Sequence, residues 1–336
     1  MKIAVIGAGA IGSLVAGYLK KAGEDVLLVG RADQVETINK KGLRIKKSDG
    51  EETVFLKAAN QLDQVYDLVI FTVKTQDLEQ AYQDNHLFLE NCLILTTQNG
   101  VQADNLLSSH LELENMMSSI VMFGSTYIHP GEVVFNFSGD WIIGKPYTTI
   151  DRPLQDVVTV LQKAFPMIVA NNIMGMKWLK LFVNFNNCIP ALIGKSMQEA
   201  FADMDFCRLS VMLLKEGLAI VKVAGIQLVS LPNFPVERIL GLANMPLDQA
   251  AGIINKTLTG LSKEPLYGSI LQSILRDKAS EIDFINGEIT LIADNLHEPA
   301  PLNKKVIALV HRVEEEKRFF SPEEIKKEFN LVEAFK

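Results

Sequence analysis

The hydrophobic pattern of the first 31 residues changes period within a few positions. Residues 3–6 form a short apolar run rich in β-branched side chains, which predicts a buried strand. A helical pattern follows over residues 10–21 and ends at Gly23. Residues 26–29 form a second apolar run. This order predicts a strand–helix–strand unit at the start of the chain.

Glycines stand at the turn from the first strand to the helix. Gly7, Gly9 and Gly12 are spaced as G-x-G-x-x-G, with Ala10 and Ile11 inside the motif. The first glycine allows the tight turn, the second lets a pyrophosphate approach the backbone, and the third lets the helix pack on the strand. The amides of the first helical turn then face the phosphates. The pattern predicts a dinucleotide site; the alternative is that the glycines only pack a flavodoxin-like unit.

The end of the second strand indicates which dinucleotide is bound. NAD sites usually carry Asp or Glu about 20 residues past the glycines, where it holds the ribose 2′-hydroxyl. This chain has Gly30 and Arg31 there. Glycine leaves the carboxylate position empty, and a guanidinium can bind a 2′-phosphate with paired hydrogen bonds. We therefore predict NADP(H), with a solvated surface arginine as the alternative for Arg31.

Two further apolar runs predict buried parallel strands with polar residues after them. Residues 67–73 are followed by Lys74, and residues 91–97 are followed by Asn99 in a Gln-Asn-Gly sequence. In an open parallel sheet, ligands bind beyond the carboxyl ends of the strands. Together with the glycine motif and Arg31, Lys74 and Asn99 predict one binding edge.

The remaining pattern divides the chain into two parts. Before Ala170 we predict helices at 34–40, from 77 and at 153–164, a strand pair at 43–45 and 53–57, an antiparallel meander at 120–122, 126–128, 133–137 and 141–143, and a strand at 167–169. Beyond it we predict helices at 174–187, 201–224, 235–241, 247–258, 269–279, 282–294, 302–315 and 322–328. The predicted fold class is α/β, with an N-terminal Rossmann-type dinucleotide-binding domain (1–170) followed by an all-helical C-terminal domain (171–336).

Composition narrows the functional classes. With 336 residues, the chain is long enough for two domains. Its formal net charge of −7 argues against nucleic acid as the main partner. The three cysteines lack metal or disulfide spacing, which predicts a cytoplasmic protein without a metal site. No run of apolar residues is long enough to span a membrane. The apolar helices predicted at 201–224 and 282–294 can bury surface within one chain or in a homodimer, and both readings stay open.

One predicted helix carries a polar stripe on a largely apolar background. Lys177, Lys180, Asn184 and Asn187 recur at helical spacing and fall on one face. A lysine can donate a proton to a carbonyl substrate while amides orient its oxygen atoms. The alternative is an ordinary solvated face.

A second stretch, residues 268–288, also carries polar residues in an apolar setting. Ser269 and Glu281 are twelve residues apart and therefore roughly 120° out of phase on a straight helix. Both can face one ligand only if the helix bends or breaks between them. The alternative for Glu281 is a surface or ion-paired carboxylate.

These pieces together resemble the ketopantoate reductase family, which reduces 2-dehydropantoate to pantoate with NADPH on the route to pantothenate and coenzyme A. The resemblance runs from Met1 to about Asn295. Its parts are GAGAIG from Gly7, Arg31 after the second strand, TVK ending at Lys74, QNG around Asn99, NNI at 171–173, KWLKLFVN ending at Asn184, and KASEIDFING ending at Gly287.

The resemblance implies roles for individual residues. Lys180 matches the catalytic lysine that protonates the developing alkoxide, and Glu281 matches the active-site glutamate. Asn99 is implied between nicotinamide and substrate, with Lys74 and Arg31 along the cofactor. Asn184 and Ser269 fall on substrate-binding positions, and Asn187 is a neighbour that can substitute for an asparagine the family has at position 188.

Departures from the family pattern leave the substrate open. Cys188, Leu266 and Ser273 stand where the family commonly has asparagine, asparagine and aspartate. We therefore expect an NADPH-dependent reductase of a small 2-oxo acid, with ketopantoate first and another 2-oxo acid as the close alternative. A non-catalytic NADPH-binding sensor is the alternative of a different class.

Overall fold

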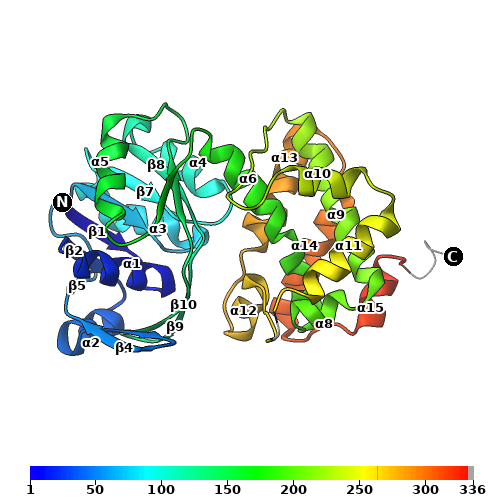
Figure 1. Ribbon diagram of the computed structural model, residues 1–336, viewed down its shortest axis with the longest axis horizontal. Coiled ribbons are helices and arrows are strands. Elements are labelled where there is room, and N and C mark those ends of the chain that lie inside the picture. Colours follow the sequence, from blue (N-terminus) through cyan, green and yellow to red (C-terminus); the bar gives the residue numbers. More distant parts are fainter. Residues whose placement is uncertain (263, 332–336) are drawn as a thin grey trace. The chain divides into compact units, whose positions relative to one another are not determined.

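An eight-stranded sheet forms the centre of the N-terminal part of the chain. In the computed structural model its strands are β1 (Lys2–Ile6), β2 (Asp25–Val29), β5 (Lys57–Ala59), β6 (Leu68–Phe71), β7 (Leu93–Thr96), β8 (Met116–Val121), β11 (Trp141–Gly144) and β12 (Met167–Val169). Their order is β12-β11-β8-β7-β6-β1-β2-β5 (Figure 1). All neighbours are parallel except β8 and β11. The chain turns to β2 on one side of β1 and later to β6 on the other, so strand order reverses at β1.

The chain divides into two compact units, Met1–Met174 and Gly175–Lys336. The structure describes residues 1–262 and 264–331. The α/β class with a helical second part is confirmed.

A second, four-stranded sheet belongs to the same N-terminal unit. It consists of β3 (Leu43–Lys47), β4 (Gly50–Val54), β9 (Gly124–His129) and β10 (Glu132–Phe137), in the order β4-β3-β10-β9.

The predicted antiparallel meander over residues 120–143 is therefore wrong. Its first and last strands join the large sheet, whereas β9 and β10 join the small one. Ion pairs stabilise the parallel pairing of β10 with β3: the carboxylate of Glu132 on β10, only 2% exposed, binds Arg44 and Lys46 of β3. The predicted strand at 53–57 is also wrong in extent, because β4 ends at Val54 and Lys57 begins β5 of the other sheet.

Helices cover both faces of the large sheet. They are α1 (Ala10–Lys21), α2 (Ala32–Lys41), α3 (Leu78–Asn85), α4 (Gln102–Ser108) and α5 (Arg152–Leu161), of which α4 was not predicted. Along β1, Ile3 and Val5 pack in the cluster that contains α1, whereas Ala4 and Ile6 pack in the cluster that contains α3. On its other side α1 contacts the small sheet, where a Cβ added to Gly17 would come within 2.6 Å of Ile45 Cδ1. Helix α1 is thus held between two sheets.

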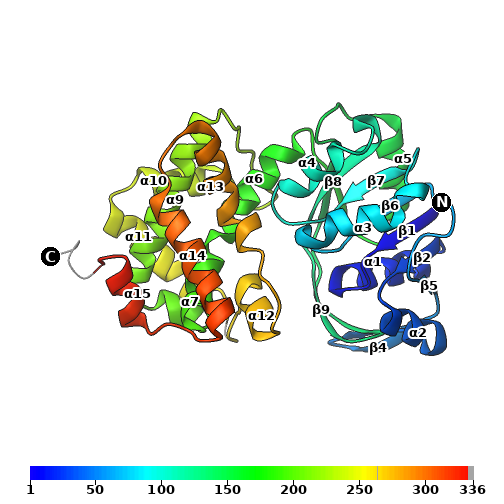
Figure 2. The ribbon, with the colours of Figure 1, turned by 180° about the vertical axis from the view of Figure 1, so that it is seen from behind.

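The C-terminal unit is helical throughout the described residues, apart from one isolated β-bridge. Its helices are α6 (Ile173–Asn184), α7 (Cys188–Ile193), α8 (Met197–Phe201), α9 (Met204–Val223), α10 (Glu237–Asn244), α11 (Leu247–Thr259), α12 (Ser269–Leu275), α13 (Asn286–Leu296), α14 (Pro301–Glu316) and α15 (Pro322–Glu328). The helices α9, α13 and α14 pack against one another (Figure 2).

Several helix boundaries differ from the predictions for physical reasons. The chain continues past α6 as a 3-10 turn, Phe185–Asn187, before α7 begins. The predicted helix 201–224 begins later, because the Asp203 carboxylate accepts a hydrogen bond from the amide of Asp205 at 2.9 Å and caps α9.

Candidate functional site

The three glycines of the motif in the N-terminal unit differ in the space available for a side chain. Gly7 has a φ of +119°, and an added Cβ would lie 2.7 Å from Val73 N. At Gly12 an added Cβ would lie 1.9 Å from Gly7 O, so helix and turn touch there. At Gly9 an added Cβ would meet nothing within 4 Å. Packing thus explains Gly7 and Gly12 but not Gly9.

Gly9 is the N-cap of α1, and Ala10 and Ile11 begin the helix. No acidic residue lies in the first turn, so the positive end of the helix dipole faces no carboxylate there. The open side of Gly9 is the cradle that a pyrophosphate needs to approach the amides of this turn. These residues fit the phosphates of a dinucleotide.

Four neighbouring parallel strands bring the other predicted cofactor residues to the same edge. Gly7 follows β1, Arg31 follows β2, and Lys74 and Asn99 follow β6 and β7. Arg31 is exposed, and the other two long side chains are partly buried. The carboxyl ends of these strands meet as the sequence predicts.

Gln98, which sequence reasoning did not single out, fixes two of these strand ends. Its Nε2 donates hydrogen bonds to Phe71 O (3.0 Å) and Val73 O (2.8 Å), and its Oε1 accepts from the amide of Thr97 (3.0 Å). The Gln98 side chain therefore joins the segment before Lys74 to the segment before Asn99. The signal in the sequence was a glutamine directly after a buried strand.

In the C-terminal unit, helix α6 separates an apolar from a polar face. Phe182 and the neighbouring Phe185 pack with ring centroids 4.9 Å apart. An added Cβ on Gly217 of α9 would lie 2.9 Å from both rings, so α9 approaches this face closely. The polar stripe that includes Lys180 and Asn184 lies on the remaining face, where both residues keep partial exposure.

The surroundings of Lys180 disfavour its charged form. The pKa of Lys180 is lowered to about 8, because burial and the nearby charge of Lys177 lower it more than the charge of Glu281 raises it. Lys177 is itself 2% exposed. The structure thus brings Lys177, Lys180 and Glu281 into one electrostatic cluster. An ammonium group with a pKa near neutrality can release a proton at physiological pH.

Glu281 reaches this cluster because the second polar stretch is not one helix. Helix α12 ends at Leu275, Asp277 adopts a φ of +55°, and Glu281 then precedes the 3-10 turn Ile282–Phe284. The break that the phase argument required between Ser269 and Glu281 is present.

The start of α12 packs on the end of the polar stripe. An added Cβ on Gly268 would lie 2.5 Å from Asn187 Oδ1 and 2.9 Å from its Cγ. The amide of Asn187 therefore lies against the Gly268 backbone, next to Ser269. Asn187 and Ser269, which are separated by about half of the helical unit in sequence, are thus close in space.

Cys188 has a different environment from Asn187. It is fully buried, and its Sγ donates to Phe185 O at 3.0 Å. Burial raises the pKa of the thiol to about 12. Cys188 is therefore a core residue and not a nucleophile.

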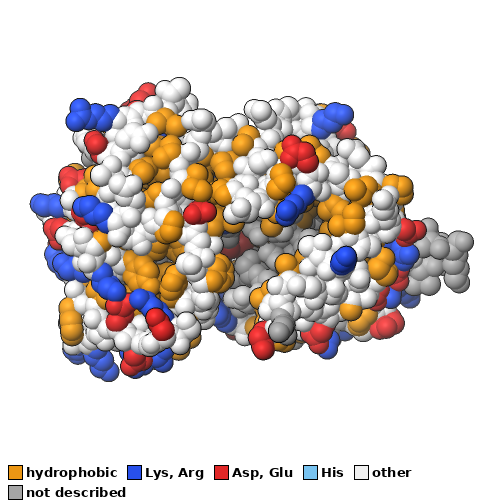
Figure 3. All heavy atoms as spheres, in the orientation of Figure 1, with side chains coloured by type: hydrophobic (Ala, Val, Ile, Leu, Met, Phe, Trp, Pro, Cys, Tyr) orange, Lys and Arg blue, Asp and Glu red, His pale blue; other side chains and the backbone are white. Residues whose placement is uncertain are grey.

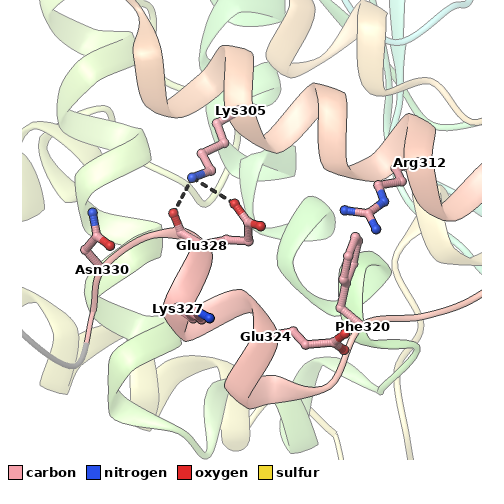
Figure 4. Close-up of a pocket in the computed structure, with 7 residues that line it drawn as sticks. All are labelled: Lys305, Arg312, Phe320, Glu324, Lys327, Glu328 and Asn330. Carbon is pink, nitrogen blue, oxygen red and sulfur yellow. Dashed lines mark hydrogen bonds and ion pairs between the residues drawn. The ribbon is translucent and has the colours of Figure 1, made fainter.

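Other surface features do not mark a second site. Acidic and basic side chains are interspersed over the visible face of each unit (Figure 3). Between α14 and α15 lies a hollow of about 560 Å³ lined by Lys305, Arg312, Phe320, Glu324, Lys327, Glu328 and Asn330 (Figure 4). Lys305 binds the Glu328 carboxylate at 3.0 Å, and Arg312 binds Glu316 outside the lining at 2.7 Å, so both of these cations are already paired. It contains none of the predicted site residues.

Neither a metal site nor a membrane-spanning helix is present among the described residues. In that part of the chain, no group of His, Cys, Asp and Glu side chains is arranged to hold a metal ion. None of the helices described combines the length and apolar character needed to cross a bilayer.

Comparisons with known proteins agree over both units. Residues 3–147 match the model of the ketopantoate reductase PanE/ApbA family, and residues 172–314 match the model of its C-terminal part. A 2-dehydropantoate 2-reductase of Pyrococcus horikoshii is 32% identical over 319 residues, covering 92% of this chain and 96% of the relative. One of Pyrococcus abyssi is 29% identical, covering 92% of this chain and 97% of the relative.

Solved structures show the same architecture. A PanE/ApbA family ketopantoate reductase from Ralstonia eutropha superposes with a TM-score of 0.79 at 27% identity, covering 94% of this chain and 99% of the other. A D-mandelate dehydrogenase with NADH and anilino(oxo)acetate has a TM-score of 0.81 at 22% identity, with coverage of 94% and 99%, and shares the fold. The chain belongs to the ketopantoate reductase family and is an oxidoreductase.

Proposed function

We propose that the protein reduces 2-dehydropantoate to pantoate with NADPH. The observation that carries the proposal is Lys180, whose pKa near 8 makes it a proton donor at physiological pH, beside Glu281 in a member of this family. In this proposal residues 1–170 hold the cofactor, and residues 171–336 supply the proton and bind the substrate.

The cofactor residues follow from the glycine-rich turn and the sheet edge. Gly9, Ala10 and Ile11 hold the pyrophosphate on backbone amides, and Gly7 and Gly12 give the turn its shape. Arg31 binds the 2′-phosphate, because position 30 is a glycine and the guanidinium is exposed.

The nicotinamide end is assigned to the other two strand ends. Lys74 lies along the cofactor, and Asn99 lies between nicotinamide and substrate. When bound, NADPH supplies the hydride. Gln98 keeps the backbone before both residues in place.

Lys180 donates a proton to the carbonyl oxygen at C2 as that atom becomes an alkoxide, and it is reprotonated from solvent. Glu281 and the substrate carboxylate both stabilise the ammonium form, which opposes the effects of burial and of Lys177. The two negative charges therefore keep the acid protonated until the oxygen requires the proton.

The substrate is held by the polar stripe and the start of α12. Asn184 and Asn187 orient its oxygen atoms, and Ser269 binds the carboxylate. The contact between Asn187 and Gly268 supports a shared subsite for Asn187 and Ser269.

Another 2-oxo acid is the second candidate substrate. Cys188 is buried and cannot present a polar group, and Leu266 is 40% exposed. An apolar residue close to Ser269 favours a less hydroxylated side chain than that of ketopantoate. A non-catalytic NADPH-binding sensor has no need of Lys180 or Glu281. A homodimer stays a prediction, which analytical ultracentrifugation tests.

The deciding experiment follows the loss of NADPH absorbance with 2-dehydropantoate and with a panel of other 2-oxo acids, each also with NADH. Wild type is compared with Lys180→Ala and with Lys222→Ala, which removes an exposed lysine of α9. We expect preference for NADPH and 2-dehydropantoate, with kcat reduced about 10³-fold only in Lys180→Ala. Turnover of another acid alone would change the substrate assignment, and NADPH binding without any turnover would support the sensor.

A further inference from the structure

The side chain of Gln34 connects three parts of the N-terminal unit. Its Nε2 donates hydrogen bonds to Ala8 O (2.8 Å) and to Tyr127 Oη (3.2 Å). Its Oε1 accepts a hydrogen bond from the amide of Arg31 (3.0 Å). The side chain is 9% exposed, so these bonds are largely shielded from water. Both amide protons and the amide oxygen are used.

Each partner of Gln34 belongs to a different element. Ala8 lies within the glycine-rich turn, Arg31 follows β2, and Tyr127 belongs to β9 of the small sheet. A glutamine at the third position of a helix often caps the amide before it, and this accounts for the bond from Arg31. Capping does not account for the bonds to Ala8 and Tyr127.

Gln34 also limits what can stand at position 30. A Cβ added to Gly30 would lie 2.6 Å from Ala8 Cβ and 2.9 Å from Gln34 Oε1. The three residues are thus in mutual contact. A carboxylate residue, which NAD sites carry at the end of this strand, does not fit while Gln34 keeps its place.

We propose that Gln34 is a positioning residue that sets selectivity for the 2′-phosphorylated cofactor, an inference that rests on the proposed NADPH dependence. It fixes the Arg31 backbone relative to the pyrophosphate turn through Ala8, so the guanidinium stands at a set distance from the phosphates. At the same time it keeps position 30 closed to a carboxylate. The small sheet contributes through Tyr127, which anchors Gln34 from outside the nucleotide fold.

The test separates binding of the 2′-phosphate from binding of the rest of the nucleotide. Isothermal titration calorimetry with the full chain measures the dissociation constants of 2′,5′-ADP and 5′-ADP for wild type and for Gln34→Met, which keeps the length and loses the hydrogen bonds. We expect the wild type to prefer 2′,5′-ADP and the variant to lose about tenfold of that preference. The ratio of kcat/KM for NADPH and NADH should fall in parallel.

Asn39 offers a matched control on the same helix. Its amide bonds the backbone of Ala58 on β5 in both directions at 2.9 Å, away from Arg31. We expect Asn39→Leu to lower the melting temperature and leave the 2′,5′-ADP preference unchanged.

Each result has a distinct meaning. An unchanged preference in Gln34→Met, or an equal loss for both ligands, overturns the selectivity role while NADPH dependence stands. A wild type without preference for 2′,5′-ADP overturns NADPH dependence and this inference with it. If Gln34→Met does not fold by circular dichroism, Gln34→Glu decides in the same way, because it retains the shape and places an acceptor against Ala8 O.

Discussion

Backbone atoms form the glycine-rich turn of the N-terminal unit, whereas charged side chains form the Lys180 cluster of the helical unit. In the turn, a Cβ added to Gly12 would lie 1.9 Å from Gly7 O, whereas a Cβ added to Gly9 would meet no atom within 4 Å. The cluster is side chain: Lys177 and Lys180 come from one helix, and Glu281 comes from a segment a hundred residues later.

This difference determines how each region fails. The glycine-rich turn needs the space that a side chain would occupy, so adding one methyl group is expected to damage it. A charged cluster depends on the balance between burial and neighbouring charges, so removing one charge alters the pKa of another. The cluster also carries a cost in stability, whereas the close contacts of the turn are part of the packing.

The largest expected effect concerns Lys180. We expect Lys180→Met to lower kcat about 10³-fold and to raise the melting temperature at pH 7, since it removes a charge that burial and Lys177 disfavour. The pKa of Lys180 is about 8 in the folded protein and 10.5 without its surroundings, so the unfolded chain binds more protons between those values. Wild-type stability should therefore rise with pH over that interval, and the advantage of the variant should shrink. Thermal melts from pH 7 to 10.5 measure this, and a variant less stable than wild type at pH 7 would contradict it.

The glycine turn predicts a contrast between two alanine substitutions. Gly12→Ala should destabilise the fold by about 3 kcal/mol, because its Cβ would lie 1.9 Å from Gly7 O. Gly9→Ala meets no protein atom, so its melting temperature should stay near that of wild type while the affinity for NADP⁺ falls about 100-fold. Calorimetry gives both quantities. Gly9→Ala with normal NADP⁺ affinity would show that the open space at Gly9 does not receive the pyrophosphate.

The Glu281 carboxylate should shift the pH dependence of the reaction. Glu281 raises the pKa of Lys180, so in Glu281→Gln the pKa of Lys180 should fall further below its ordinary value. Because the general acid must be protonated, kcat/KM should decline with rising pH from near pH 8 in wild type and from a lower pH in the variant. We expect the ratio of variant to wild-type kcat/KM to fall as the pH rises from 6 to 8. An unshifted profile with lower activity would instead assign Glu281 to substrate binding.

The two regions also differ in how far the sequence predicts them. The bounds of α1 and the strand ends at Gly7, Arg31, Lys74 and Asn99 follow from local patterns, since glycine spacing and apolar runs act over a few residues. Tertiary partners do not follow from such patterns.

Four features of the structure did not follow from local sequence patterns. The small sheet pairs β10 with β3, where Glu132 forms ion pairs with Arg44 and Lys46, and no period of two or 3.6 encodes this pairing. The break after Leu275 was identified as a condition for a shared site, but its location was not predicted. The contact of Gly268 with Asn187 joins segments 81 residues apart. The glycine at position 268 was the only sign of this contact in the sequence. Gln34 was not predicted either, because its hydrogen bonds to Ala8 and Tyr127 join segments that are distant in sequence.

The smallest expected effect tests whether the helical unit also contains a site that requires a glycine because another side chain lies against it. Gly268 has an ordinary φ of −64°, so its only structural reason to be glycine is the approach of Asn187. Gly268→Ala should push the Asn187 amide away from Ser269 and raise KM for the 2-oxo acid about fivefold, with kcat nearly unchanged, since Lys180 is not displaced. Gly252→Ala on α11 is the control, because its Cβ would meet nothing within 4 Å. If Gly268→Ala lowers kcat and leaves KM alone, the Asn187 contact belongs with the Lys180 chemistry and not with substrate binding.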